Sequence, residues 1–178
     1  MTENALQAER LHLARLLEAI QRCIFFLDAS VQKTPWPLTK VYLENHKEDV
    51  ALFESLSSIN ERFSKLQDTL GAAMRHAAIL SSEPSNTFLK LLSFYEKAGI
   101  IESIESWQLC RTIRNLAAHD YGIDYADVSE HFNALRELIP VLYGNAYRFF
   151  QYCNQNLGVT PAPGGFDESF VRITQTFR

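Results

Sequence analysis

Glycine, proline and cysteine are all scarce in this chain of 178 residues, which contains seven, six and three of them respectively. The glycines and prolines cluster at breaks and not within periodic segments, which favours long helices over many short strands. Cys23, Cys110 and Cys153 are far apart in the sequence and form no Cys-x-x-Cys pair. A disulfide framework or a zinc knuckle is therefore not expected, and a reducing compartment fits this use of cysteine.

The chain also lacks long apolar runs and an excess of positive charge. No run approaches the ~20 apolar residues that span a bilayer, and the N-terminal region carries Glu3 and Glu9 in place of a basic and then apolar signal region. We therefore expect a cytoplasmic protein without a membrane segment. The net charge of −4 argues against broad coating of nucleic acid, which needs a basic surface, but leaves room for a small basic cleft.

Apolar residues instead recur at spacings of three and four through most of the chain. This period predicts helices over the following ranges: 5–31, about 48–80, from Phe88 to a stop at Gly99, 103–119, and from Asp124 or Asp127 to about 153. Residues 39–46 fit either a short helix or the start of the next long one. Pro140 should kink the last helix and not end it, because the apolar stripe continues beyond it.

These elements predict an all-α protein, an antiparallel bundle of four to five long helices. We assign residues 1–158 to the bundle domain and residues 159–178 to a C-terminal tail. The boundary follows Gly158 and precedes the Pro161–Gly165 stretch, both of which interrupt the helical pattern.

Groups able to bind an anion and to move a proton are concentrated in residues 111–121, which read Arg-Thr-Ile-Arg-Asn-Leu-Ala-Ala-His-Asp-Tyr. The arginine guanidinium is a planar fork that matches phosphate oxygens. Histidine titrates near neutrality, so it can accept or donate a proton. In RNA the neighbouring 2′-hydroxyl supplies the nucleophile. These residue types therefore suit cleavage of a phosphodiester bond without a metal ion.

The spacing of these residues places them on different faces of one helix. Arg111, Asn115 and His119 form one stripe, and Arg114 lies on an adjacent stripe. Arg114 and His119 are five residues apart and diverge around the helix, so they suit the wall of a cleft or a two-fold interface better than one small site. Cations near a helix C-terminus also stabilise the helix dipole, which is a purely structural role.

The string Arg114-Asn115-Leu116-Ala117-Ala118-His119-Asp120-Tyr121 resembles the motif of the HEPN superfamily, and especially of its HepT-like toxins. That motif is Arg, a polar residue, three mostly apolar residues, His, any residue and Tyr. The following Gly122-Ile123-Asp124 is similar to the family's continuation into the next helix. Over the rest of the chain the resemblance is architectural.

HEPN toxins are homodimeric, metal-independent endoribonucleases whose paired motifs line the dimer cleft, and they need no cofactor. The resemblance implies that Arg114 binds and stabilises the phosphate, that His119 does the acid–base work and that Asn115 supports both. It implies RNA as the ligand of Arg114. Arg111 precedes the motif by three residues, and we take it as a further RNA-binding candidate because it belongs to the same concentration of anion-binding groups. HepT-like toxins pair with an MNT-type nucleotidyltransferase antitoxin, which adenylylates the motif tyrosine, here Tyr121.

Two alternatives stay open at this point. Some HEPN relatives are non-catalytic partners of nucleotidyltransferases, and the acidic net charge and extra length near residues 32–47 fit a helical binding module as well. A purely structural dimeric bundle is the other. On the second long helix, Arg62, Lys65 and Arg75 either extend a basic track toward RNA or form a solvated helix face.

Overall fold

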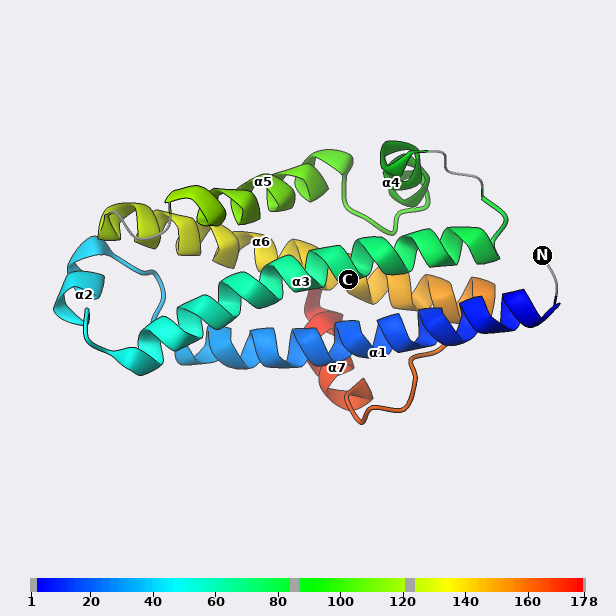
Figure 1. Ribbon diagram of the computed structural model, residues 1–178, viewed down its shortest axis with the longest axis horizontal. Coiled ribbons are helices and arrows are strands. Elements are labelled where there is room, and N and C mark those ends of the chain that lie inside the picture. The colour runs from blue at the N-terminus through cyan, green and yellow to red at the C-terminus, as the bar shows by residue number, and fades with distance from the viewer. Residues whose placement is uncertain (1–2, 84–86, 121–123, 178) are drawn as a thin grey trace.

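The computed structural model describes residues 3–83, 87–120 and 124–177, with the side chains of residues 116–120 outside that description. The described chain is helical and forms a bundle, which confirms the prediction of an all-α bundle (Figure 1). Its helices are α1 (Glu3–Lys33), α2 (Lys40–Asn45), α3 (Val50–Leu80), α4 (Phe88–Lys97), α5 (Ile104–Asp120), α6 (Tyr125–Tyr152) and α7 (Asp167–Thr174). A π-helical segment, Cys153–Leu157, extends α6, and a 3-10 turn, Gln175–Phe177, follows α7.

The long helices α1, α3, α5 and α6 reverse direction from one to the next, as the colours in Figure 1 show. α1 and α3 lie side by side, and α6 contacts α1, α3 and α5. Each helix turns an apolar stripe toward the others, and these stripes merge into one continuous core. Figure 1 shows α4 and α5 on one side of α3 and α1 on the other.

Residues 39–46, which the sequence left undecided, form the separate short helix α2. Thr39 caps its N-terminus, because the Thr39 side chain accepts a hydrogen bond of 3.1 Å from the backbone N–H of Tyr42. A second cap follows at Asp49, whose carboxylate accepts from the Leu52 N–H and starts α3. Two caps this close together divide the stretch into two helices.

The start of the last long helix is decided by Asp124. Its side chain accepts a hydrogen bond of 3.0 Å from the Ala126 N–H, so Asp124 and not Asp127 is the N-cap of α6. The helix passes through Pro140 and ends at Tyr152, as expected from the unbroken apolar stripe. None of the described helices is at once long enough and apolar enough to be a candidate membrane span.

The segment after Gly158 packs back onto the bundle. α7 contacts α1 and α6, and it buries Phe170 and Ile173. The Phe170 ring stacks on the Phe150 ring of α6, with the two centroids 4.2 Å apart. The segment that the sequence assigns to a tail thus contributes side chains to the core.

Candidate functional site: a cationic cavity between α3, α4 and α5

The part of α5 that precedes the Arg-His motif is anchored on α3 by its apolar side. Trp107 and Cys110 are almost fully buried. Gln67 of α3 fixes the contact, because its side-chain amide donates a hydrogen bond of 2.8 Å to the Trp107 carbonyl. Arg114 follows Cys110 by about one turn, so this packing directs position 114 toward α3.

Arg114 binds two groups of α3. Its Nη1 donates to the Asp68 carboxylate at 2.5 Å and to the Ser64 carbonyl oxygen at 3.2 Å. The Arg114 side chain is 16% exposed, whereas the Asp68 side chain is 65% exposed. The guanidinium is therefore held in the wall of the bundle, and its carboxylate partner lies at the rim.

A cavity of about 140 Å³ lies between these helices. Three arginines and one carboxylate take part in its lining, in a chain whose net charge is −4. The lining residues are Gln67, Asp68, Gly71 and Arg75 of α3, Phe88 of α4, and Trp107, Arg111 and Arg114 of α5. Within the described residues, neither Arg75 nor Arg111 forms an ion pair. The cavity therefore carries an excess of positive charge.

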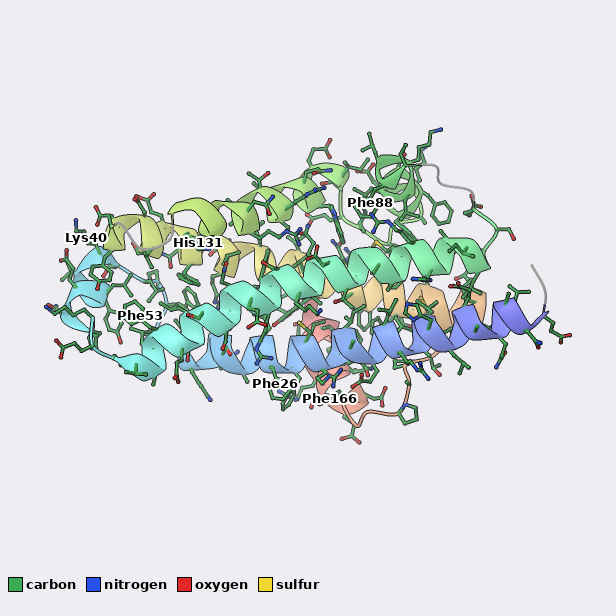
Figure 2. All side chains as sticks on the ribbon, in the orientation of Figure 1. Phe26, Lys40, Phe53, Phe88, His131 and Phe166 are labelled. Atoms are coloured by element: carbon green, nitrogen blue, oxygen red, sulfur yellow. The ribbon has the colours of Figure 1, made fainter. Side chains whose placement is uncertain are left out.

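The aromatic side of the cavity holds Arg75 in place. The Arg75 guanidinium lies over the Phe88 ring, 4.4 Å from its centroid, and the Phe88 and Trp107 ring centroids are 6.1 Å apart. Figure 2 labels Phe88, whose side chain lies where α4 meets α3. A guanidinium over an aromatic face keeps its charge and its N–H edge available for a ligand.

Gly71 allows the aromatic rings to approach the backbone of α3. A Cβ at this position would lie 3.3 Å from Phe88 Cζ and 3.5 Å from Trp107 Cζ2. Gly71 is one helical turn from Gln67 and one from Arg75, so all three share a face of α3. This face forms the floor of the cavity.

The cavity offers donors for an oxyanion and no nucleophilic thiol. Arginine forks bind phosphate oxygens in pairs and stay charged at any physiological pH. Cys110, on the buried side of α5, is a neutral thiol, because burial raises its pKa to about 12. The buried Oε1 of Gln67 accepts no hydrogen bond from the described residues. The arrangement can bind and orient a phosphate group.

The structure brings together some of the residues predicted for the site. Arg111 and Arg114 line one cavity, and Asn115 is exposed on α5. The side chain of His119 and the whole of Tyr121 lie outside the described residues. Because α5 stays helical to Asp120, positions 114 and 119 are about 140° apart around its axis.

The basic residues of the second long helix separate into two groups. Arg75 joins the cavity, whereas the Arg62 guanidinium lies over the Phe26 ring of α1, 4.9 Å from its centroid. Sequence analysis did not select Gln67, Asp68 or Phe88. Gln67 could have been found from the sequence, because Gln67, Gly71 and Arg75 are spaced by four residues and so share one face of the helix.

The chain was also compared with known proteins. None of the protein-family models, curated proteins or solved structures in these comparisons matches it significantly. Within the described residues, no group of three or more His, Cys, Asp or Glu side chains is placed to hold a metal ion.

Proposed function

We propose that this chain is a metal-independent endoribonuclease of the HepT-like type, the toxin of a toxin–antitoxin pair. The observation that carries the proposal is the cationic cavity on α5, which gathers Arg111 and Arg114 of the motif with Arg75 in an otherwise acidic chain. Basic side chains gathered at one place on an acidic protein suit local binding of a polyanion. An MNT-type nucleotidyltransferase is the proposed antitoxin, with Tyr121 as the residue that it modifies.

In the proposed reaction the 2′-hydroxyl oxygen of one ribose attacks the adjacent phosphorus, and the bond to the 5′-oxygen of the next nucleotide breaks. The products are a 2′,3′-cyclic phosphate and a 5′-hydroxyl. His119 moves the proton from the attacking hydroxyl or to the leaving oxygen. Arg114 stabilises the negative charge on the phosphoryl oxygens, and Asn115 supports both residues.

A symmetric dimer would meet the geometric requirement of this reaction. Positions 114 and 119 diverge by about 140° around α5, and a single histidine does not easily serve as base and acid in one step. Two copies related by a two-fold axis supply two histidines and two arginines to one cleft. We therefore propose that the cleaving species is a homodimer.

One observation favours a second candidate, a non-catalytic helical module that binds a nucleotidyltransferase. Arg114 is already bound by Asp68 and by the Ser64 carbonyl oxygen, which is the arrangement expected of a residue that joins α5 to α3. In such a module the cavity would serve binding alone, and no RNA would be cleaved.

The experiment that separates these candidates is cleavage of labelled RNA by the purified protein in EDTA. We expect the wild type to cleave and to leave 2′,3′-cyclic phosphate ends, and His119→Ala and Arg114→Ala to lose at least about a hundredfold in rate, as for loss of a proton-transfer group or a charge-stabilising donor. Gln108→Ala, at an exposed position of α5, is the matched control and should cleave normally. Equal cleavage by His119→Ala and the wild type would refute the proposal.

Arg114→Ala also removes two hydrogen bonds to α3, so its stability must be measured beside its activity. We expect a loss of about 1–2 kcal/mol in the free energy of unfolding, which leaves a domain of ordinary stability folded. Arg114→Lys keeps the charge and loses the fork, and it should fold normally while cleaving poorly. Absence of cleavage by every variant and by the wild type, with Tyr121 unmodified by mass spectrometry, would favour the binding module.

A further inference from the structure

We infer that the cavity between α3, α4 and α5 binds one phosphate of the RNA strand, a neighbour of the scissile phosphate. Arg75 and Arg111 hold this flanking phosphate. The inference rests on the proposed function only for the identity of the strand. The binding site itself follows from the lining of the cavity.

The two arginines approach the cavity from different helices. Arg75 belongs to α3 and Arg111 to α5, and both line the same space of about 140 Å³. Neither has a carboxylate partner among the described residues. Like charges gathered in one small space repel each other, and a bound anion relieves this repulsion. Guanidinium forks from two helices that line one small space can bind the oxygens of a tetrahedral phosphate.

Phe88 prepares one of these donors for binding. Its ring lies beneath the Arg75 guanidinium at 4.4 Å. This contact already limits the rotamers of the Arg75 side chain, so less conformational entropy is lost when Arg75 binds a ligand. The face of the guanidinium is covered by the ring, and its N–H edge remains for the ligand. Phe88 is thus a positioning residue for Arg75.

The position along α5 distinguishes this phosphate from the scissile one. Residue 119 lies eight residues beyond Arg111, about 12 Å along the helix axis. A phosphate held between Arg75 and Arg111 is therefore displaced along α5 from the histidine position. Arg114, which also lines the cavity and which we assign to the scissile phosphate, lies between Arg111 and residue 119 on α5. We therefore assign the phosphate between Arg75 and Arg111 to the neighbouring nucleotide, where its binding fixes the register of the strand.

Asp68 is an internal competitor of the bound phosphate. Its carboxylate occupies Arg114 at the edge of the cavity and is 65% exposed, so it repels an incoming anion at short range. Replacing this carboxylate by an amide keeps the size of the side chain and removes the repulsion. Asp68→Asn is therefore expected to bind phosphate more tightly than the wild type.

The test measures binding separately from cleavage. A fluorescent single-stranded oligothymidylate carries the phosphates of RNA but no 2′-hydroxyl, so it binds without being cut. We expect Arg75→Ala and Arg111→Ala each to raise the Kd for the oligothymidylate about five- to tenfold. Each should also reduce the slope of log Kd against log salt concentration by about one, because one phosphate contact is lost. Asp68→Asn should lower the Kd several-fold, a gain that no misfolded variant can imitate. Arg62→Ala, whose guanidinium lies over Phe26 on the α1 side, should bind like the wild type.

Unchanged Kd values in both Arg75→Ala and Arg111→Ala would overturn the inference, as would weaker binding by Asp68→Asn. A competition experiment tests whether the cavity is instead a site for free phosphate. Inorganic phosphate is added to the bound oligothymidylate, and chloride at equal ionic strength is the comparison. We expect millimolar phosphate to leave the oligothymidylate bound, because the strand contacts more than one site. Full displacement at that concentration would identify the cavity as a site for free phosphate and overturn the assignment to a strand.

The inference and the proposed function fail in different ways. If RNA is cleaved, Arg75→Ala should raise KM and leave kcat nearly unchanged, because a flanking phosphate is bound equally in the ground state and the transition state. Cleavage with unaltered KM in Arg75→Ala would overturn the flanking site alone. Binding that depends on Arg75 without any cleavage would support the site and refute the nuclease.

Discussion

Arg114 is directed to its partners by its position on α5. It follows the buried Cys110 by about one turn, so it faces α3 and reaches Asp68 there. Asn115, the next residue on α5, is exposed. A rotation of about 100° between neighbouring residues thus separates a side chain bound within the fold from one available to a partner.

Gly144 gives a prediction at the scale of one residue. A Cβ at this position would lie too close to the Phe177 backbone carbonyl for the chain to stay in place. Gly144→Ala should therefore destabilise the full chain by about 1 kcal/mol, the cost of displaced packing outweighing the higher helix propensity of alanine. Urea unfolding measures this change.

The control for Gly144→Ala is the same substitution in a chain shortened to end at Gln175. Without Phe177 the remaining close neighbour of a Cβ at position 144 is the end of the flexible Arg148 side chain, at 3.1 Å, which can move aside. Gly144→Ala should then stabilise the shortened chain by up to about 1 kcal/mol through helix propensity. Stabilisation of the full chain as well would show that Phe177 does not lie against Gly144.

At the scale of elements, two faces of α3 contact different helices. One face packs against α1, and another carries Gln67, Gly71 and Arg75 toward α4 and α5. The short α4 contributes Phe88, which is one of the residues that line the cavity. The site is thus made by three helices, none of which contains all of its donors.

The side chain of Asn133, on α6, holds the segment between α1 and α2 by two hydrogen bonds. The Asn133 amide accepts from the Leu38 N–H at 2.9 Å and donates to the Leu38 carbonyl oxygen at 2.8 Å. Asn133→Ala would leave both backbone groups of a buried residue unpaired, and we expect a loss of about 2–4 kcal/mol in the free energy of unfolding. Chemical denaturation measures this loss.

Asn60→Ala on α3 removes an amide that lies 3.3 Å from the His131 ring and bonds no backbone group of the described residues, so it serves as the comparison for Asn133→Ala. It should cost much less, about 1 kcal/mol. If the two variants unfold at the same urea concentration, the double hydrogen bond to Leu38 does not hold the segment.

At the scale of the whole molecule, the three cysteines report on the integrity of the bundle. Cys23, Cys110 and Cys153 are buried in different helical segments, and burial raises their pKa values to about 11, 12 and 12 respectively. The thiolate is the reactive form, and its fraction at pH 8 falls tenfold for each unit by which the pKa rises.

We therefore expect labelling by a disulfide reagent at pH 8 to be at least about a hundredfold slower in the folded protein than in urea. The rate should rise with pH and with denaturant for all three thiols together, because each needs the bundle to open. Mass spectrometry after brief labelling identifies which cysteine reacts. Rapid labelling of one cysteine in the native protein would show that its helix opens independently of the others.

The amino-acid sequence alone determined the helices and the concentration of functional groups in residues 111–121. Helix periods, caps and breaks are local, so they are legible in a one-dimensional pattern, and the bounds of α1, α3 and α5 lie within a few residues of those predicted. The resemblance of the motif to HepT-like toxins is of the same local kind, and it remains a prediction.

Only the tertiary structure decided which charges meet. Arg62 and Arg75 look alike in the sequence, yet one lies over Phe26 of α1 and the other over Phe88 of α4. The pairing of Arg114 with Asp68 joins residues 46 positions apart, and the docking of α7 buries Phe170 against α6. A helix period fixes the direction of a side chain relative to its own axis, whereas its partner depends on how separate helices pack, and that is set by the shared core.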